Sequence, residues 1–358
     1  RSSLESIYRT PLASIAQRQK GKPVMITEWH FCCPNQYRAE GGAAGGAYAA
    51  LNGINGIFDF NPVLFIYRWG EPMSSQHVPM GMFSTYDDPV NFHNALITAL
   101  LFLRGDVKEA DREFLLRVSP DIYKDKNALL YTNFGRKWRG QPLPSFTVFG
   151  AVGKIGIEVS AEKGGKDTFD NNELLKTYRN DDPFTELRKR GFMKNGVIIS
   201  TTGEITAVPS GKQLKVVTPR SEALVQEGAE QSGKLLSVRK NSTFSNIFAG
   251  ALDDASLFRS RRVLVIHTTN VMPSTTYSLY RGNLHLHKTG SMPYFIRRGS
   301  AEISLKNQGS GTPKLYALDM HGNRVAEIPF TNRNGIITFT ANNDLGKHCP
   351  MAYELIRQ

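Results

Sequence analysis

The pattern of hydrophobic and polar residues changes its period along this chain of 358 residues. Apolar residues recur at helical spacing between residues 3 and 20, which predicts a helix. A short apolar run at 24–26 follows the breakers Gly21 and Pro23 and predicts a buried strand. Residues 39–52 then predict a helix, 57–60 a second buried strand, and 90–103 a helix that begins after Asp88-Pro89.

From residue 197 onward the chain carries short apolar segments separated by Gly and Asn turns, a spacing typical of a β-sandwich. Residues 119–190 show only short apolar pieces among Lys, Asp, Asn and Gly, and we interpret them as a connecting or inserted region. The segments expected to form strands are 197–199, 214–217, 262–267, 276–280, 284–287, 301–305, 315–318, 324–328 and 336–340.

The predicted helix at 39–52 contains four glycines, Gly41, Gly42, Gly45 and Gly46. Gly is a poor helix residue, so we expect that the small side chains let this helix lie close to a neighbouring strand. A phosphate-binding loop would need Gly-x-x-x-x-Gly-Lys-Ser/Thr or Gly-x-Gly-x-x-Gly spacing, which this segment lacks.

The first predicted strand ends on a carboxylate, Glu28, with Trp29 and His30 directly after it. A charge at the end of a buried strand is costly unless it is paired or used. In barrels of parallel strands, catalytic groups lie at the C-terminal ends of the strands. Glu28 is therefore a candidate catalytic residue, and a salt bridge that only closes the strand end is the alternative.

The order of these segments resembles strand seven, helix seven and strand eight of the clan A retaining glycoside hydrolases. The most similar members are bacterial polysaccharide hydrolases with a β-rich domain after the barrel. The resemblance rests on Ile26-Thr27-Glu28-Trp29, on Pro34-Asn35-Gln36-Tyr37-Arg38-Ala39-Glu40 and on the run from Ala47 to Phe60. It extends more loosely to Phe83, Asp88-Pro89 and 100–108, and in the trailing domain to Thr218-Pro219-Arg220 and 262–269. It implies cleavage of a β-linked polysaccharide with retention, and Glu28 as the nucleophile.

We therefore expect an α/β plus all-β fold. Residues 1–118 would hold the last two strand–helix units of a (β/α)8 barrel, 119–190 a connecting or inserted region, and 191–358 a β-sandwich. A whole barrel needs about 250 residues. Strands one to six are thus expected upstream, with the acid/base Glu of the family's Asn-Glu pair, and this missing N-terminal barrel portion would be a partner. The fragment alone is predicted not to hydrolyse a glycan.

Several residues near the predicted strand ends are candidates for substrate binding, since aromatic rings stack on sugars and Asn, His and Arg bind hydroxyls or carboxylates. For Arg38, an ion pair with Glu28 or Glu40 is an equally good interpretation, and Glu40 is interpreted as a charge at the helix N-terminus. Packing within a loop is the alternative for Trp69. The predicted substrate-binding set is Trp29, His30, Asn35, Tyr37, Arg38, Asp59, Asn61 and Trp69.

The net charge of +12 comes entirely from the part of the chain after residue 118. Residues 1–118 contain 11 Lys/Arg and 11 Asp/Glu, which leaves 33 and 21 for the remainder. A basic domain beside a neutral segment suits an anionic partner such as an acidic polysaccharide, although a merely basic soluble domain has the same composition. The alternative function is a non-catalytic carbohydrate-binding or structural module that holds an acidic glycan.

Other classes of partner find little support in the sequence. Basic pairs such as Arg261-Arg262 lack the aromatic residues of a nucleic-acid module, so no nucleic acid is expected. The three cysteines form neither a disulfide framework nor a metal-binding spacing, and we expect no metal and no cofactor. The most apolar run, 95–103, is shorter than the roughly 20 residues of a membrane span. The family resemblance implies a secreted or periplasmic protein.

Overall fold

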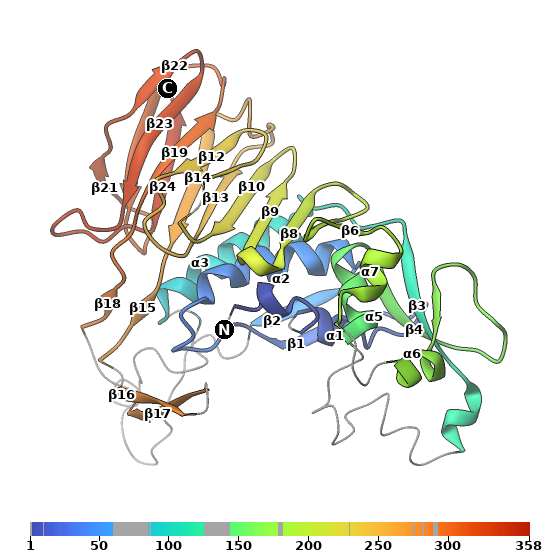
Figure 1. The fold of residues 1–358 in the computed structure, drawn as a ribbon. Coiled ribbons are helices and arrows are strands. Elements are labelled where there is room, and N and C mark those ends of the chain that lie inside the picture. The colour runs from blue at the N-terminus through green and yellow to red at the C-terminus, as the bar shows by residue number, and fades with distance from the viewer. Residues whose placement is uncertain are drawn as a thin grey trace, which may run out of the picture.

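The computed structural model describes residues 2–9, 11–59, 85, 87–124, 144–177, 182–228, 230–274, 276–280, 283–288 and 293–358. The architecture is mixed α/β and rich in strands. In Figure 1, large antiparallel sheets occupy the upper left, a layer of helices lies beneath them, and a parallel pair of strands lies beneath the helices.

Two antiparallel sheets pack face to face in the C-terminal half, which confirms that this half is rich in strands. Inner side chains of both sheets, such as Val265 and Phe339, share one hydrophobic core. The smaller sheet has the order β11 (Gln231–Ser232), β12 (Leu236–Arg239), β19 (Ser300–Lys306), β23 (Ile336–Asn342) and β22 (Thr331–Arg333). The larger sheet has the order β21 (Arg324–Glu327), β20 (Pro313–Leu318), β24 (Ala352–Arg357), β14 (Arg262–Thr268), β13 (Ser245–Ala251), β10 (Ser221–Gln226), β9 (Gln213–Val217), β8 (Ile205–Val208), β7 (Val197–Ile199) and β6 (Met193–Lys194).

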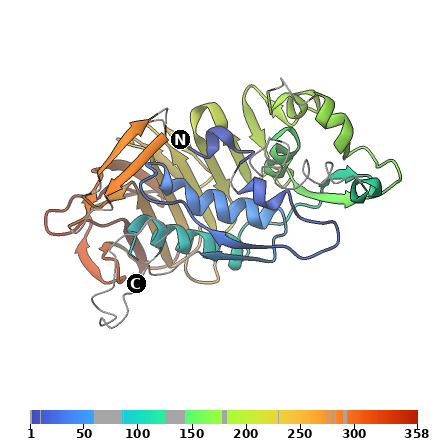
Figure 2. The same cartoon turned by 90° about the horizontal axis from the view of Figure 1, so that it is seen from below.

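Helices cover the middle of the second face of the larger sheet. Val225, Phe248 and Ile266 point away from the sandwich core and join the core formed with α2 (Gly41–Leu51) and α3 (Pro89–Thr98). Figure 2, which views the molecule from below, shows α2 and α3 side by side in front of the sheet. Every residue of β10 and β13 is therefore buried, and these strands lack the alternation by which a strand is predicted.

The predicted strand–helix–strand unit near the N-terminus is confirmed. Strand β1 (Met25–Trp29) pairs in parallel with β2 (Gly56–Asp59), and α2 connects them. The short helix η2 (Arg38–Glu40) leads into α2, whose residues are all buried.

The glycines of α2 are explained by close contacts on two sides of the helix. A Cβ atom at Gly45 would lie 2.5 Å from the Trp29 ring, so β1 approaches the helix axis closely. A Cβ atom at Gly42 would lie 2.7 Å from the backbone of Asn94 in α3. The predicted close approach to a strand is confirmed, and the same small residues also admit a neighbouring helix.

Helix α3 begins as predicted, because the Asp88 side chain accepts a hydrogen bond from the backbone N–H of Val90. It continues as the π-helical turn η4 (Ala99–Leu103) and ends before Gly105, whose φ of +76° follows the last turn.

The single helix predicted for residues 3–20 is wrong. The structure has two short helical segments, η1 (Leu4–Ser6) and α1 (Leu12–Ile15), with Pro11 between them. Proline has no backbone N–H and disfavours helical geometry in the residue before it, so the turns do not fuse. The apolar positions still face the core, since Leu4, Ile7 and Leu12 are buried.

The region interpreted as a connection contains part of a small parallel sheet. Strand β3 (Glu113–Val118) lies between β4 (Lys154–Val159) and β5 (Thr168–Asp170), so the pairing crosses the predicted boundary after Val118. The backbone of Gln19 bridges to Ile157, which ties the N-terminal segment to β4. Helical segments η5 (Pro120–Tyr123), α5 (Pro144–Thr147), η6 (Val148–Ala151), α6 (Asn171–Thr177) and α7 (Thr185–Lys189) accompany this sheet, and η7 (Pro209–Gly211) follows β8.

Two predicted strands lie outside the sandwich sheets. Strands β16 (Thr276–Tyr280) and β17 (Asn283–Lys288) pair only with each other in the described part of the chain, and form a hairpin at the lower left of Figure 1. The short pair β15 (Val271–Met272) and β18 (Phe295–Ile296) connects this hairpin to the sandwich.

Candidate functional site

The C-terminal ends of β1 and β2 lie together and carry two carboxylates. Trp29 is in register with Asp59, so Glu28 and Asp59 close neighbouring strands at the same end of the pair. Both residues are exposed. Although Asp59 as a residue is exposed, surrounding atoms displace water from its carboxyl group and raise its pKa.

An irregularity in β1 determines which side chains face the helix. The pairing register shifts between Ile26 and Trp29, and these two residues are buried while Thr27 and Glu28 are exposed. Strict alternation would have placed Glu28 on the buried face with Ile26 and would have exposed Trp29. The bulge therefore buries Trp29 and exposes Glu28.

Glu28 makes no hydrogen bond or ion pair with any residue that the structure describes. The alternative in which it closes the strand end through a salt bridge thus finds no partner among these residues.

Trp29 is a packing residue in this structure, which corrects its assignment as a sugar-binding side chain. It is 6% exposed, packs against the bare backbone of Gly45, and meets Phe31 edge to face at 5.6 Å. No face of the indole is open for stacking on a sugar.

Arg38 is also internal, and the structure supports an ion pair rather than substrate contact. Its side chain and that of Asp88 are both fully buried, and Arg38 Nε lies 2.9 Å from Asp88 Oδ2. Arg38 Nη2 donates to the backbone oxygen of Val271 at 2.7 Å, and Nη1 donates to that of Asn35 at 3.3 Å. The acid that pairs with Arg38 is therefore Asp88, not Glu28 or Glu40.

The remaining residues that were predicted to bind substrate have different environments. Tyr37 packs edge to face on Phe244 at 4.8 Å, and its hydroxyl accepts from Lys212 at 3.4 Å, so it joins the strand-end loop to the sandwich. The side chain of Asn35 accepts from the backbone N–H of Tyr37 at 3.0 Å. His30 is half-buried beside the strand end. Asn61 and Trp69 lie outside the described residues.

Glu40 is committed to anchoring the N-terminal segment. Its buried carboxyl accepts from the Ser2 hydroxyl and from the backbone N–H of Ser3, both at 2.5 Å. Burial raises the pKa of Glu40 to about 7. Although this pKa suits acid–base chemistry, the carboxyl faces the interior and does not reach a substrate.

The outer face of the smaller sheet carries a groove that was not predicted from the sequence. Its side chains come from β12, β19, β23 and β22, together with the loop before β12. The sequence contains two signals for it: the excess of Lys and Arg after residue 118, and the alternation of the predicted strands, which places polar residues on one face.

Comparison with known proteins identifies no matching family model and no matching curated protein. In the part of the chain that the structure describes, no three His, Cys, Asp or Glu side chains group as metal ligands. No described helix has both the length and the apolar character that a transmembrane helix requires.

Proposed function

We propose that this chain supplies the nucleophile of a retaining glycoside hydrolase that acts on a β-linked polysaccharide. The observation that carries the proposal is the exposed carboxylate of Glu28 near the C-terminal end of a parallel strand, which no described residue pairs and which lies one residue before Trp29, the register partner of Asp59. In this proposal, β1, α2, β2 and α3 are the last two strand–helix units of a (β/α)8 barrel.

The uncovered face of the strand pair supports this assignment. Helices α2 and α3 lie on one side of the pair, whereas Met25 is 50% and Phe58 is 52% exposed on the other. A Cβ atom at Gly56 would touch both Met25 and Phe58, so these apolar side chains lie together. In a closed barrel this face would belong to the packed interior.

The proposed chemistry needs two carboxyl groups about 5–5.5 Å apart. The Glu28 carboxylate attacks the anomeric carbon and forms a glycosyl ester, while the bond to the leaving oxygen breaks. A second carboxyl group protonates that oxygen and later removes a proton from the attacking water. Because Glu40 is buried and hydrogen-bonded, we assign this acid/base role to the barrel portion outside residues 1–358, and Asp59 to binding a sugar hydroxyl.

The nucleophile can be tested without the acid/base group. Dinitrophenyl β-glycosides with fluorine beside the anomeric carbon have a leaving group that departs as a phenolate and form a long-lived ester. We expect a panel of such sugars to label the chain on the peptide that contains Glu28, as detected by mass spectrometry.

Matched variants make this test decisive. Glu28→Gln should abolish the label, and Glu5→Gln, which changes another exposed carboxylate, should keep it. Equal labelling of the Glu28→Gln protein, labelling spread over other carboxylates, or no labelling by any sugar would overturn the proposal. Natural polysaccharides should remain uncleaved by the isolated chain, and turnover that depends on Glu28 would show that an acid/base group is present in it.

A second function, glycan binding without catalysis, is favoured by one specific observation, the groove on the smaller sheet. Binding that survives Glu28→Gln would separate it from hydrolysis.

A further inference from the structure

The outer face of the smaller sheet contains a polar groove of about 380 Å³. Leu236 and Val238 of β12, Ile303 and Leu305 of β19, and Ile337 and Phe339 of β23 point inward to the sandwich core. The residues between them consequently point outward. The groove is lined by Lys234, Leu235, Ser237, Arg239, Ser304, Lys306, Thr331, Arg333, Ile336 and Thr338.

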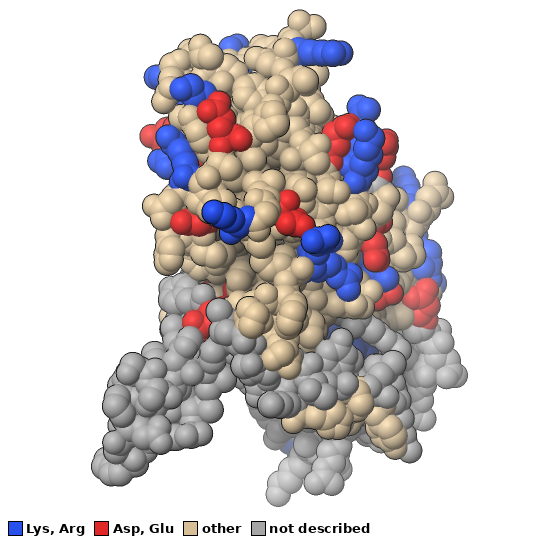
Figure 3. Space-filling view, turned by 90° about the vertical axis from the view of Figure 1, so that its left-hand side faces the viewer, with Lys and Arg blue, Asp and Glu red and all other residues tan. Residues whose placement is uncertain are grey.

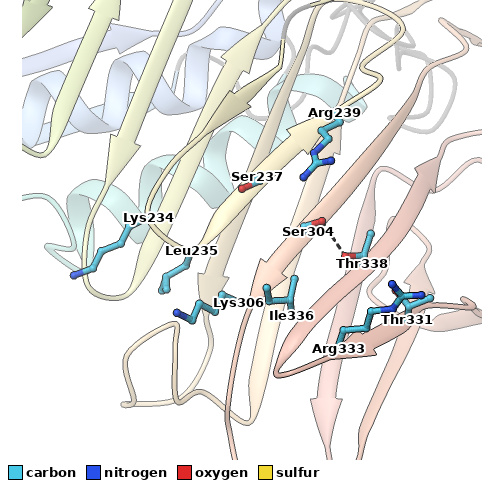
Figure 4. A pocket seen from close by; sticks show the side chains of 10 residues that line it. All are labelled: Lys234, Leu235, Ser237, Arg239, Ser304, Lys306, Thr331, Arg333, Ile336 and Thr338. Atoms are coloured by element: carbon cyan, nitrogen blue, oxygen red, sulfur yellow. Dashed lines mark hydrogen bonds between the residues drawn. The ribbon is translucent and has the colours of Figure 1, made fainter.

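Four of these residues are cations that form no ion pair with a described residue. Lys234, Arg239, Lys306 and Arg333 are exposed, and none of them forms an ion pair within the described chain. They surround the hydroxyl groups at the centre of the groove (Figure 4). A neighbouring acid, Glu302, is opposite Arg239 in the sheet but is bound by Lys240 at 3.0 Å.

This arrangement differs from the charge distribution in the middle of the face drawn in Figure 3. There, Lys and Arg side chains stand beside Asp and Glu side chains, so their charges largely offset one another. The groove instead concentrates four cations, and none of the residues that line it is acidic, which creates a positive potential for an anionic ligand.

The groove is held in shape by buried hydrogen bonds. The carboxylate of Glu222, buried inside the larger sheet, accepts from the backbone N–H groups of Lys234, Leu235 and Leu236 at 3.2, 2.9 and 2.8 Å. This carboxylate is therefore held by hydrogen bonds to the loop that carries Lys234. Across the floor, the Ser304 and Thr338 hydroxyls are hydrogen-bonded at 2.9 Å.

The groove continues into a second hollow of about 470 Å³ that shares Lys234, Leu235 and Lys306. The second hollow adds Phe258, whose ring lies 5.8 Å from the Lys306 ammonium. The first groove crosses four adjacent strands, or about 14 Å at the usual strand spacing. An open trough of this extent fits a linear polymer better than a small molecule.

We propose that this groove binds an anionic polysaccharide, with the four cations on its carboxylate or sulfate groups and the Ser and Thr side chains on its hydroxyls. Arg and Lys form strong charge-assisted hydrogen bonds to such anions. Single-stranded nucleic acids bind largely by stacking on aromatic rings, and the floor of the first groove contains none. The proposal does not rest on the hydrolase proposal, because binding here does not involve Glu28.

The test is affinity electrophoresis and calorimetry of the full chain with a polyuronate, a sulfated glycan, a neutral glucan and single-stranded DNA. We expect the chain to bind the polyuronate or the sulfated glycan. Which of the two it binds tells whether the groove recognises carboxylate or sulfate groups. The affinity should weaken with added salt. Loss of two charged contacts in Arg239→Ser/Arg333→Ser should lower that affinity by about tenfold or more.

The control variant removes two other exposed cations that form no ion pair with a described residue, Arg261→Ser/Lys347→Ser. Its affinity should stay within about twofold of the unchanged protein, because it alters only general charge. Both variants should keep the original melting temperature, since the replaced side chains are exposed. Equal losses in both variants, no binding to either anionic glycan, or tighter DNA binding that the groove variant abolishes would each overturn the proposal.

Discussion

Replacing Arg38 with methionine should destabilise the protein strongly. The substitution removes the guanidinium from the fully buried Asp88 and from the backbone oxygen of Val271. Asp88 Oδ1 keeps its bond from the backbone N–H of Val90 at 2.9 Å, but the charge of the carboxylate loses its counterion. Removing one partner of a buried ion pair costs about 3–5 kcal/mol, so we expect the free energy of unfolding to fall by an amount in that range.

A double-mutant cycle measures how much of this loss comes from the pair itself. Asp88→Asn leaves an oxygen that can still cap α3, but strands the buried Arg38 charge. Arg38→Met/Asp88→Asn removes both charges and should cost less than the sum of the single changes by about 0.5–3 kcal/mol. Arg239→Met, at an exposed arginine, should change stability by no more than about 0.5 kcal/mol.

Urea unfolding followed by tryptophan fluorescence and circular dichroism gives these free energies. A loss below about 1 kcal/mol for Arg38→Met would refute the buried-pair reasoning. If such a variant also lost affinity for saccharides, Arg38 would instead be a substrate-facing side chain.

Two further changes test other parts of the structure. Gly45→Ala places a Cβ atom 2.5 Å from the Trp29 ring, and this overpacking, at about 1–3 kcal/mol, should outweigh the roughly 1 kcal/mol helix preference for Ala. The urea midpoint should fall, and Trp29→Leu in the same chain should make Gly45→Ala neutral or favourable. His267 is buried, and burial lowers its pKa from 6.5 to about 4. Between these values the unfolded chain binds a proton that the folded chain does not, so His267 lowers stability as the pH falls below about 6.5, by about 3 kcal/mol at pH 4. Glu40, with its pKa raised to about 7, acts in the opposite direction, so the measurement compares His267→Gln with the unchanged protein at each pH. An unchanged difference from pH 7 to pH 5 would contradict the low pKa of His267.

Local signals in the sequence were sufficient to predict several of the helices and strands. The apolar runs before Glu28 and around Ile57, with small residues between them, predicted the β1–α2–β2 unit that the structure contains. The Asp88-Pro89 pair predicted where α3 begins, because a capping side chain and a proline act within one turn. Strands with one solvated face, such as β19 and β23, were predicted because their side chains alternate.

The tertiary structure decided what these signals do not contain. Strands β10 and β13 have no period because a sheet covers one face and helices the other, and this covering depends on residues far apart in the chain. The β1 bulge buries Trp29 and exposes Glu28, which strict alternation would have reversed. The basic groove assembles only when the pairing of the strands brings Arg239, Lys306 and Arg333 to one face. Periodicity and capping act over a few residues, whereas burial and the meeting of charges are set by long-range packing.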